Sequence, residues 1–421
     1  MLNTKKNMAA KWAIYFLTVL FLIFEMGVQV SPSVMTSQLM HDLHLNTFQL
    51  GLMSGFYFYT YTIMQIPSGL LFDYHNPRII ISTAILICTL GALAFSFATT
   101  IYTAILARLL MGLGSAFAFI SVLVVSADLF KHSRFALLTG ITQMLAAIGA
   151  MMGQIPLSIL VAKYGWRHVM VYIAIIGFIL TALIWTFVNY ERTIHQSSTS
   201  TENYGSIANN LKNILKVKQT WLIGFYAFLL WAPMSGFASL WGIPYLETTF
   251  QITHTTAASL CALMWIGIAI ASPLLGWFST TIHRRILPLW LSAFIGIIGF
   301  SFVLFSKATQ GLWIFGIGTL LAGFACSGQA LSFSLIKDIN HPKQKGTAIA
   351  FNNMAVVISG AFFQPIIGKL LSIFHHNQLL TSPHYSVTAF RYSLLLIFAC
   401  YVLASVIAKF FLKESYCQSI H

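Results

Sequence analysis

Residues 12–35 read WAIYFLTVLFLIFEMGVQVSPSVM, a run of apolar side chains that contains a single acid, Glu25, near its centre. A helix rises about 1.5 Å per residue, so this run is long enough to cross the roughly 30 Å hydrocarbon core of a bilayer. It therefore predicts a retained transmembrane helix. An ionisable side chain deep in such a helix is costly and usually has a function. Glu25 is accordingly the first candidate functional residue.

The composition of the whole chain indicates an integral membrane protein. Hydrophobic residues make up 58% of the sequence and charged residues 8%, and the mean hydropathy is +0.80. An ordinary soluble protein carries about 25% charged residues. Apolar runs of about 20 residues predict an all-α membrane protein with twelve transmembrane helices, near 12–35, 47–72, 79–98, 101–127, 135–162, 167–189, 220–246, 255–278, 286–306, 310–336, 346–372 and 389–412.

A polar stretch at residues 190–219, with SSTSTENYG at its centre, divides these helices into two sets of six. We expect an N-terminal six-helix bundle at 1–189, a cytoplasmic linker at 190–219 and a C-terminal six-helix bundle at 220–421. If the N-terminus is inside, 17 of the 23 Lys and Arg residues lie on that side and four lie on the other. Cytoplasmic loops carry the excess of basic residues. Both termini are therefore predicted to be cytoplasmic, and the net charge of +14 requires no nucleic-acid partner.

The two halves share sequence features at a nearly constant offset of 207 to 211 residues, which predicts two pseudo-symmetric bundles. Matching positions occur after the second span and in the fourth and fifth spans of each half. They are Gly69 with Gly276, LLMG at 109–112 with LLAG at 320–323, Gln143 with Asn353, and Gln154 with Gln364.

The motifs at these positions resemble those of the major facilitator superfamily, and the resemblance covers the whole chain. The family's cytoplasmic signature is met by Gly69, Asp73 and Arg78, with Tyr74, Asn76 and Pro77 departing from its usual residues. In the second half, Thr280 replaces the aspartate while Arg284 and Arg285 remain. Two further family elements are met by Arg108 with Gly112 in the fourth span and by Gly149, Gly153 and Pro156 in the fifth.

This resemblance implies a secondary-active transporter that works by alternating access and has no cofactor. Some segments also look like a branch of solute carriers from intracellular proteobacteria, distantly similar to lysosomal dipeptide carriers. A carboxylate at a cytoplasmic turn can accept hydrogen bonds from a helix N-terminus and pair with an arginine. We therefore expect a cytoplasmic gate, unless these are ordinary loop charges; its candidates are Asp73 with Arg134, beside Arg78 and Asp128, and Asp338 with Lys345.

Polar side chains inside the spans are the candidates for a solute site. Glu25 and Gln29 are four residues apart and share a helix face. Arg108 could lie at the depth of Glu25, so that the two form a pair or bind one solute. The alternative is a structural role, as a permanent ion pair or neutral acid for Glu25 and as a snorkelling side chain for Arg108. The remaining candidates are Tyr57, Tyr61, Gln65, Gln143, Trp231, Ser235, Asn352 and Asn353, which could equally pack helix against helix.

These residues favour proton-coupled uptake of a small polar or zwitterionic solute, such as an amino acid or a short peptide, with Glu25 carrying the proton. The alternatives are a proton-coupled exporter of drugs, siderophore or metabolites, and a membrane sensor or scaffold that does not transport. There is no GxxxxGK[ST] loop, and the five cysteines show no paired spacing, so neither ATP hydrolysis nor a metal site is predicted. We expect a non-enzymatic monomer in a bacterial inner membrane.

Overall fold

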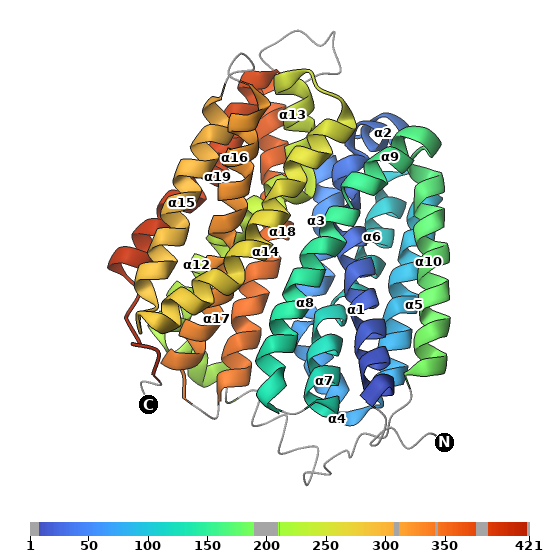
Figure 1. Ribbon diagram of the computed structural model, residues 1–421. Helices are drawn as coiled ribbons and strands as arrows, with labels where there is room; N and C mark the ends of the chain where they lie inside the picture. Colours follow the sequence, from blue (N-terminus) through green and yellow to red (C-terminus); the bar gives the residue numbers. More distant parts are fainter. Residues whose placement is uncertain are drawn as a thin grey trace. The chain divides into compact units, whose positions relative to one another are not determined.

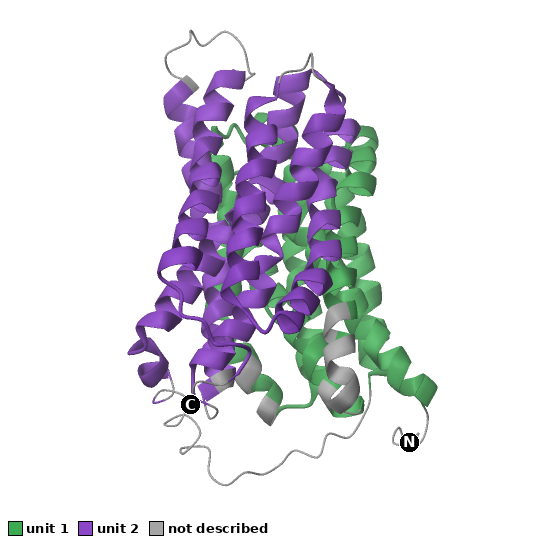
Figure 2. Ribbon diagram, turned by 60° about the vertical axis from the view of Figure 1, so that its left-hand side comes forward, with its two compact units in different colours: residues 1–194 green, residues 195–421 purple. Residues whose placement is uncertain are grey.

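The computed structural model describes residues 8–130, 132–188, 209, 211–306, 311–341, 344–375 and 386–418. The described residues form helices and turns and contain no strand. The chain divides into two compact units, residues 1–194 (unit 1) and 195–421 (unit 2), which Figure 2 colours separately. The division falls in the stretch expected to be a linker, 190–219, of which 190–208 and 210 lie outside the described residues.

Unit 1 contains ten α-helices among its described residues, together with a 3₁₀ turn at Ser31–Val34 (Figure 1). The helices are α1 (Met8–Val30), α2 (Thr36–Asp42), α3 (Thr47–Ile63), α4 (Gln65–Tyr74), α5 (Pro77–Ser96), α6 (Ile101–Ser115), α7 (Ala118–Leu129), α8 (His132–Met152), α9 (Ile155–Tyr164) and α10 (Trp166–Phe187).

The described part of unit 2 is also helical, and a π-helix at Pro233–Trp241 interrupts its first span. Its α-helices are α12 (Lys218–Ala232), α13 (Gly242–Phe250), α14 (His254–Thr281), α15 (Ile286–Phe305), α16 (Leu312–Cys326), α17 (Gly328–Ile339), α18 (Lys345–His375) and α19 (Val387–Phe410).

Eleven helical segments of the described chain are long and apolar enough to cross a membrane. They correspond to the expected spans apart from the second, 47–72, which is divided between α3 and α4 at Met64. The sequence explains this break, because Pro67 has no N–H to donate to the carbonyl of Ile63 four residues earlier. The all-α membrane fold expected from the sequence is thus confirmed, and the second span consists of two helices, as do the fourth (α6 and α7), the fifth (α8 and α9) and the tenth (α16 and α17).

Glycines set the closest helix contacts of both units. A Cβ atom added to Gly112 on α6 would lie 2.0 Å from the carbonyl oxygen of Tyr57 on α3. A Cβ atom added to Gly323 on α16 would lie 2.0 Å from the carbonyl oxygen of Met264 on α14. Only glycine permits so close an approach of two helix backbones. The repeated LLMG and LLAG segments therefore correspond to repeated packing.

An arginine at the start of the last span of each unit makes a second repeated contact. Arg167 on α10 donates from Nη1 to the carbonyls of Ser96 and Ala98, at 3.0 and 2.7 Å, just after α5. Arg391 on α19 donates from Nη2 to the carbonyl of Ser306, at 2.9 Å, just after α15. The last four carbonyls of a helix have no partner within it. These arginines therefore complete the ends of α5 and α15.

Candidate functional site

Glu25, Tyr57 and Arg108 come together in the buried part of unit 1, from α1, α3 and α6. The Tyr57 hydroxyl donates a hydrogen bond to Glu25 Oε1 at 2.5 Å. The central carbon of the Arg108 guanidinium lies 4.5 Å from the centroid of the Tyr57 ring. All three side chains are at most 1% exposed. Tyr57 thus contacts the acid through its hydroxyl and the base through its ring face, where a cation is attracted.

Arg108 makes its hydrogen bonds with neutral groups. Its Nη1 donates to the carbonyl of Val28 at 3.3 Å and to Met111 Sδ at 3.6 Å, and its Nη2 donates to the carbonyl of Ser54 at 3.4 Å. No acid among the described residues forms an ion pair with Arg108. Within the same residues, Arg108 Nε and Glu25 Oε2 have no hydrogen-bond partner. Each charged group therefore retains one atom that a solute could satisfy.

The glycine contacts hold this triad in place. Gly112 lies one turn after Arg108 and packs on the backbone of Tyr57, while Thr60 Oγ1 donates to the carbonyl of Leu109 at 2.8 Å. Close to Glu25, a Cβ atom on Gly153 would lie 2.7 Å from the Cα atom of Gly27. These contacts fix α6 against α3, and α8 and the residues after it against α1.

The remaining candidates of unit 1 lie on four of its helices, α1, α3, α4 and α8. Gln29, one turn after Glu25, is buried, and so are Tyr61 and Gln65. The Tyr61 ring centroid lies 5.9 Å from that of Tyr57, and Gln65 Nε2 donates to the carbonyl of Tyr61 at 3.4 Å. The predicted stripe on the second span therefore runs from α3 across the break into α4. Gln143, on α8, is half-buried.

In unit 2, the candidates lie on α12, the π-helix and α18. Ser235, in the π-helix, is buried, and its Oγ lies 2.8 Å from Ser359 Oγ on α18. Asn352, on α18, is 0% exposed and donates from Nδ2 to Ser332 Oγ at 2.8 Å, while its Oδ1 has no partner among the described residues. Trp231 on α12 and Asn353 on α18 are half-buried.

Gln364 is a buried residue that sequence reasoning did not place in the site. Its side-chain Nε2 donates to the backbone carbonyl of Ser235 at 2.8 Å, and its backbone carbonyl accepts from Trp241 Nε1 at 2.9 Å. It thus bonds the π-helix at two points from α18. Short π-helical segments frequently mark functional sites. The match of Gln364 with Gln154 in the repeat was the signal that could have identified it.

The candidate gate of unit 1 is described only in part. The side chains of Asp73 and Arg134 lie outside the described residues, so their expected pairing stays a prediction. Asp128 is exposed on α7, and the Arg78 guanidinium lies 4.4 Å from the ring centroid of Trp185. Asn76, which departs from the family signature, accepts a hydrogen bond from the Arg78 N–H at 2.9 Å. It is the N-cap of α5, with Pro77 in the first helical position, where both residue types are favoured.

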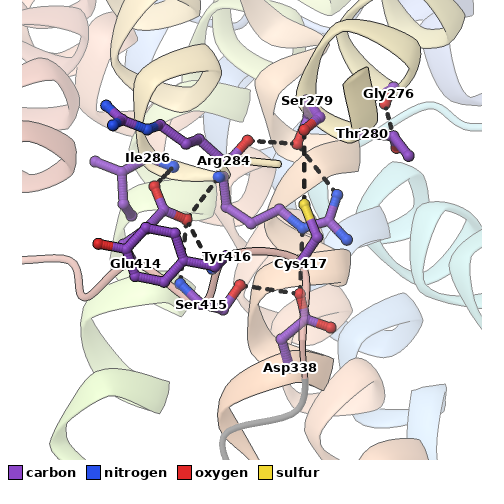
Figure 3. Close-up of polar contacts among 11 residues, drawn as sticks. Gly276, Ser279, Thr280, Arg284, Ile286, Asp338, Glu414, Ser415, Tyr416 and Cys417 are labelled. Atoms are coloured by element: carbon purple, nitrogen blue, oxygen red, sulfur yellow. Dashed lines mark hydrogen bonds and ion pairs between the residues drawn. The ribbon is translucent and has the colours of Figure 1, made fainter. Parts of the chain in front are cut away.

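In unit 2, Asp338 lies in a network of polar contacts, shown in Figure 3. Arg285 donates from Nε to Asp338 Oδ2 at 3.1 Å and from Nη1 to Ser279 Oγ at 3.1 Å. Ser415, beyond the last helix, also donates to Asp338 Oδ2, at 3.0 Å. Asp338 therefore pairs with Arg285, and the side chain of its expected partner Lys345 lies outside the described residues.

The C-terminal segment adds a carboxylate that the sequence did not lead us to place here. Glu414 accepts from the N–H groups of Arg285 and Ile286, at 2.7 and 2.9 Å, and so caps the start of α15 (Figure 3). A negative charge at a helix N-terminus is stabilising. The hydroxyl of Thr280, which replaces the family's aspartate, donates to the carbonyl of Gly276 in its own helix, at 2.9 Å.

Several known transporters resemble this chain. An uncharacterized transporter of Bacillus subtilis (strain 168), YybO, is 23% identical over 77% of this chain and 79% of its own length. A probable sulfoacetate transporter of Cupriavidus necator, SauU, is 23% identical over 61% of this chain and 62% of its own length. A probable hexose phosphate transport protein of Chlamydia muridarum is 22% identical over 79% of this chain and 78% of its own length.

Solved structures show the same fold at low identity. The nucleoside transporter NupG superimposes with a TM-score of 0.77 at 13% identity, over 95% of this chain and 98% of its own. A bacterial homologue of the human lysosomal transporter Spinster, in an inward-facing and occupied conformation, gives 0.75 at 16%, over 96% and 97%. The sequence profile of the Major Facilitator Superfamily matches residues 17–242 and 232–418. The chain is therefore a membrane transporter of the major facilitator superfamily and not an enzyme.

Proposed function

We propose that this transporter moves a small zwitterionic solute, such as an amino acid or a short peptide, together with protons, and that it does so by alternating access. The observation that carries the proposal is the buried triad of unit 1. Glu25 and Arg108 both contact Tyr57, and each keeps one polar atom without a partner among the described residues. Buried polar atoms normally have partners, so a bound solute is a reasonable source of the missing ones.

The two charges of a zwitterion match this arrangement. The planar guanidinium of Arg108 presents donors suited to a carboxylate, and Nε is one of its free donors. A solute ammonium would in turn pair with Glu25 Oε2. Burying an unpaired ion costs several kcal/mol (order of magnitude). A solute that supplies both an ammonium and a carboxylate gives each buried charge a partner and so avoids this cost.

The cost of burying an unpaired charge also couples solute binding to proton binding at Glu25. Glu25 is fully buried, and a buried carboxylate is costly unless a proton or a cation accompanies it. The Tyr57 hydroxyl holds one carboxyl oxygen, and the proton and the solute then act at the other. Because linkage is reciprocal, a solute that changes proton binding at Glu25 is itself bound in a pH-dependent manner.

A small organic anion without an amino group is the second candidate solute. Two of the similar transporters favour it, because one is named as a probable sulfoacetate transporter and the other as a probable hexose phosphate transport protein. For such a solute, Arg108 would bind the anionic group, and protonated Glu25 would donate a hydrogen bond instead of pairing with an ammonium.

We further propose that the protein is a monomer of a bacterial inner membrane with both termini in the cytoplasm. The support is the distribution of Lys and Arg along the sequence, since cytoplasmic loops hold the excess of basic residues. The gate of unit 1, Asp73 with Arg134, is part of the same proposal and would close on this side.

The test is solute-driven proton movement in liposomes that contain the purified protein and an internal pH dye. Pools of amino acids and dipeptides are compared with a pool of sulfonates, sugar acids and sugar phosphates. Wild type is compared with Glu25→Gln and with a control, Glu247→Gln. Glu247 is a half-buried acid at the C-terminal end of α13 that pairs with His254 at 2.6 Å. It has the same side chain as Glu25 but lies outside the triad.

A proton flux that follows addition of a zwitterion, is lost in Glu25→Gln and persists in Glu247→Gln would support the proposal. A response to the anion pool alone would select the second candidate. Solute movement that carries no protons and is unchanged in Glu25→Gln would overturn proton coupling and leave Glu25 with a structural role.

A further inference from the structure

A cleft of about 440 Å³ opens at the end of unit 2 where α15 begins, α19 ends and the C-terminal segment follows. Its lining combines cationic, aromatic and aliphatic side chains. Those that carry the argument are Arg284, Leu287, Trp290, Lys409, Leu412 and Tyr416. The cap formed by Glu414 on α15 brings the C-terminal segment back along the helix, so that Leu412 and Tyr416 form one wall of the cleft.

The cleft carries two cations that no acid neutralises. Arg284 and Lys409 are both exposed, and neither forms an ion pair with any acid in the described part of the chain. Glu414 also lines the cleft, but both its oxygens accept backbone N–H groups at the start of α15. Figure 3 shows Arg284 extending away from Asp338, on the side where Glu414 and Tyr416 lie. The cleft is therefore suited to an anionic group.

A lipid-facing surface continues from this cleft along α15. Exposed apolar side chains recur at helical spacing over the whole helix, namely Leu287, Phe294, Ile298, Phe302 and Phe305. An apolar stripe of this kind on a membrane-spanning helix faces acyl chains. Trp290 and Tyr416, beside the cations, are residue types that collect at the level of lipid headgroups. The Lys409 ammonium lies 5.1 Å from the ring centroid of Trp290.

We propose that this cleft binds an anionic phospholipid. The lipid phosphate lies between Arg284 and Lys409, the glycerol region lies against Trp290 and Tyr416, and an acyl chain follows the apolar stripe of α15 from Leu287. A soluble phosphate compound could use the two cations but not the stripe. A lipid of zero net charge could use the stripe but leaves part of the positive charge unmatched. The combination of both features selects the anionic lipid.

The test measures lipid binding to the full-length protein in detergent by native mass spectrometry. Phosphatidylglycerol is compared with phosphatidylcholine of identical acyl chains, each titrated with and without millimolar inorganic phosphate. The variant is Arg284→Ala with Lys409→Ala. The matched control is Lys216→Ala with Lys337→Ala, which removes the same charge from two exposed lysines outside the cleft. Each cation near an anionic lipid contributes about fivefold in affinity, so the loss of two should weaken phosphatidylglycerol binding to the cleft variant about 25-fold.

The proposal would be supported if the cleft variant lost affinity for phosphatidylglycerol while the control kept it. Affinity for phosphatidylcholine should change little in either variant. Equal affinity of wild type for the two lipids, or an equal loss in the control, would overturn it. Full displacement by inorganic phosphate would overturn it too, in favour of a soluble anion. If the double variant does not purify as a folded protein, Lys409→Gln alone gives the same comparison, with about a fivefold loss expected.

Discussion

In unit 1, Gly112 of α6 packs on the carbonyl of Tyr57, and in unit 2, Gly323 of α16 packs on that of Met264. One turn before the glycine, the first unit has Arg108 and the second has Thr319. Thr319 is equally buried, but its hydroxyl bonds back to the carbonyls of Phe315 and Gly316 in its own helix, at 3.2 and 3.0 Å. The same packing thus forms without a charge in unit 2, so packing does not explain the arginine of unit 1.

The largest expected effect tests the shared packing. Gly112→Ala and Gly323→Ala each force a Cβ atom to within 2.0 Å of a backbone oxygen, so the two helices must separate. Overpacking of this kind costs about 1–3 kcal/mol or more. We expect both variants to lose much of their folded yield in size-exclusion chromatography and to unfold at clearly lower temperature.

Gly276→Ala is the matched control, because a Cβ atom at Gly276 meets nothing within 4 Å. It should unfold at or slightly above the wild-type temperature, since alanine is favoured over glycine within a helix by about 0.5–1 kcal/mol. A Gly323→Ala variant as stable as this control would show that the two units do not share the packing after all.

The second prediction tests the difference between the units. Arg108→Gln removes the charge that contacts the ring face of Tyr57, whereas Thr319→Val removes a hydroxyl bonded within its own helix. Hydrogen bonds to charged groups are worth about 1.5–3 kcal/mol, so Arg108→Gln should lower the initial transport rate at least about tenfold. Thr319→Val should stay within about twofold. Rates are compared per folded protein in liposomes, and equal losses in the two variants would place the solute contacts in both units alike.

The sequence predicted the triad's members because each is expensive in lipid. Glu25 and Arg108 are charged, and Tyr57 stands in an unusual stripe of polar residues. What it could not supply was their arrangement. Arg108 bonds to the carbonyls of Val28 and Ser54 instead of pairing with Glu25, because its side-chain direction depends on how α6 packs against α1 and α3. No spacing along one chain segment encodes that contact.

The N-terminal ends of α5 and α15 show the same limit for a different reason. The Asn76–Pro77 cap of α5 is local and can be predicted from the sequence. The cap of α15 comes from Glu414, 129 residues away from Arg285, in a segment with no recognisable motif. The broken second span was signalled by Pro67, but a continuous apolar pattern from 47 to 72 concealed it. Long-range polar contacts such as this cap of α15 are what the sequence could not reveal.

The third prediction compares these two caps. Asn76→Ala removes one side-chain acceptor from α5 and should cost about 1 kcal/mol. Glu414→Gln weakens the interaction with α15 by a similar amount, about 0.3–2 kcal/mol, but it also loosens the C-terminal segment. Limited proteolysis near the C-terminus should therefore accelerate in Glu414→Gln and stay unchanged in Asn76→Ala. Lys413→Gln is the control, since Lys413 contributes a backbone N–H to Gln219 and its side chain is exposed. Equal protease resistance in all three variants would mean that Glu414 does not hold the segment.

The smallest expected effect concerns Asp42, an acid of unit 1 that lies beside Arg167 at the start of α10. Asp42 accepts from Trp166 Nε1 at 2.9 Å, lies 4.0 Å from Arg167 Nε and contacts His41 Nδ1 at 3.0 Å. The hydrogen bond from His41 and then that from Trp166 lower the pKa of Asp42 below its ordinary value. In the described part of unit 2, no acid forms an ion pair with Arg391, which occupies the corresponding place.

A carboxyl group with a lowered pKa in the folded state stabilises the protein above its unfolded-state pKa, near about 3.9, and loses that contribution as the pH falls through the folded-state value. Asp42 is more than a third exposed, so solvent screening keeps the effect below about 1 kcal/mol. Asp42→Asn should unfold slightly below wild type at pH 7, and its deficit should shrink as the pH falls below about 3.9 towards 3, measured by thermal unfolding across that range. Because Arg391→Ala removes a contact with a backbone carbonyl and no carboxylate, its deficit should be the same at both pH values. A deficit of Asp42→Asn that persisted at pH 3 would show that the side chain stabilises unit 1 through its shape and hydrogen bonds and not through its charge.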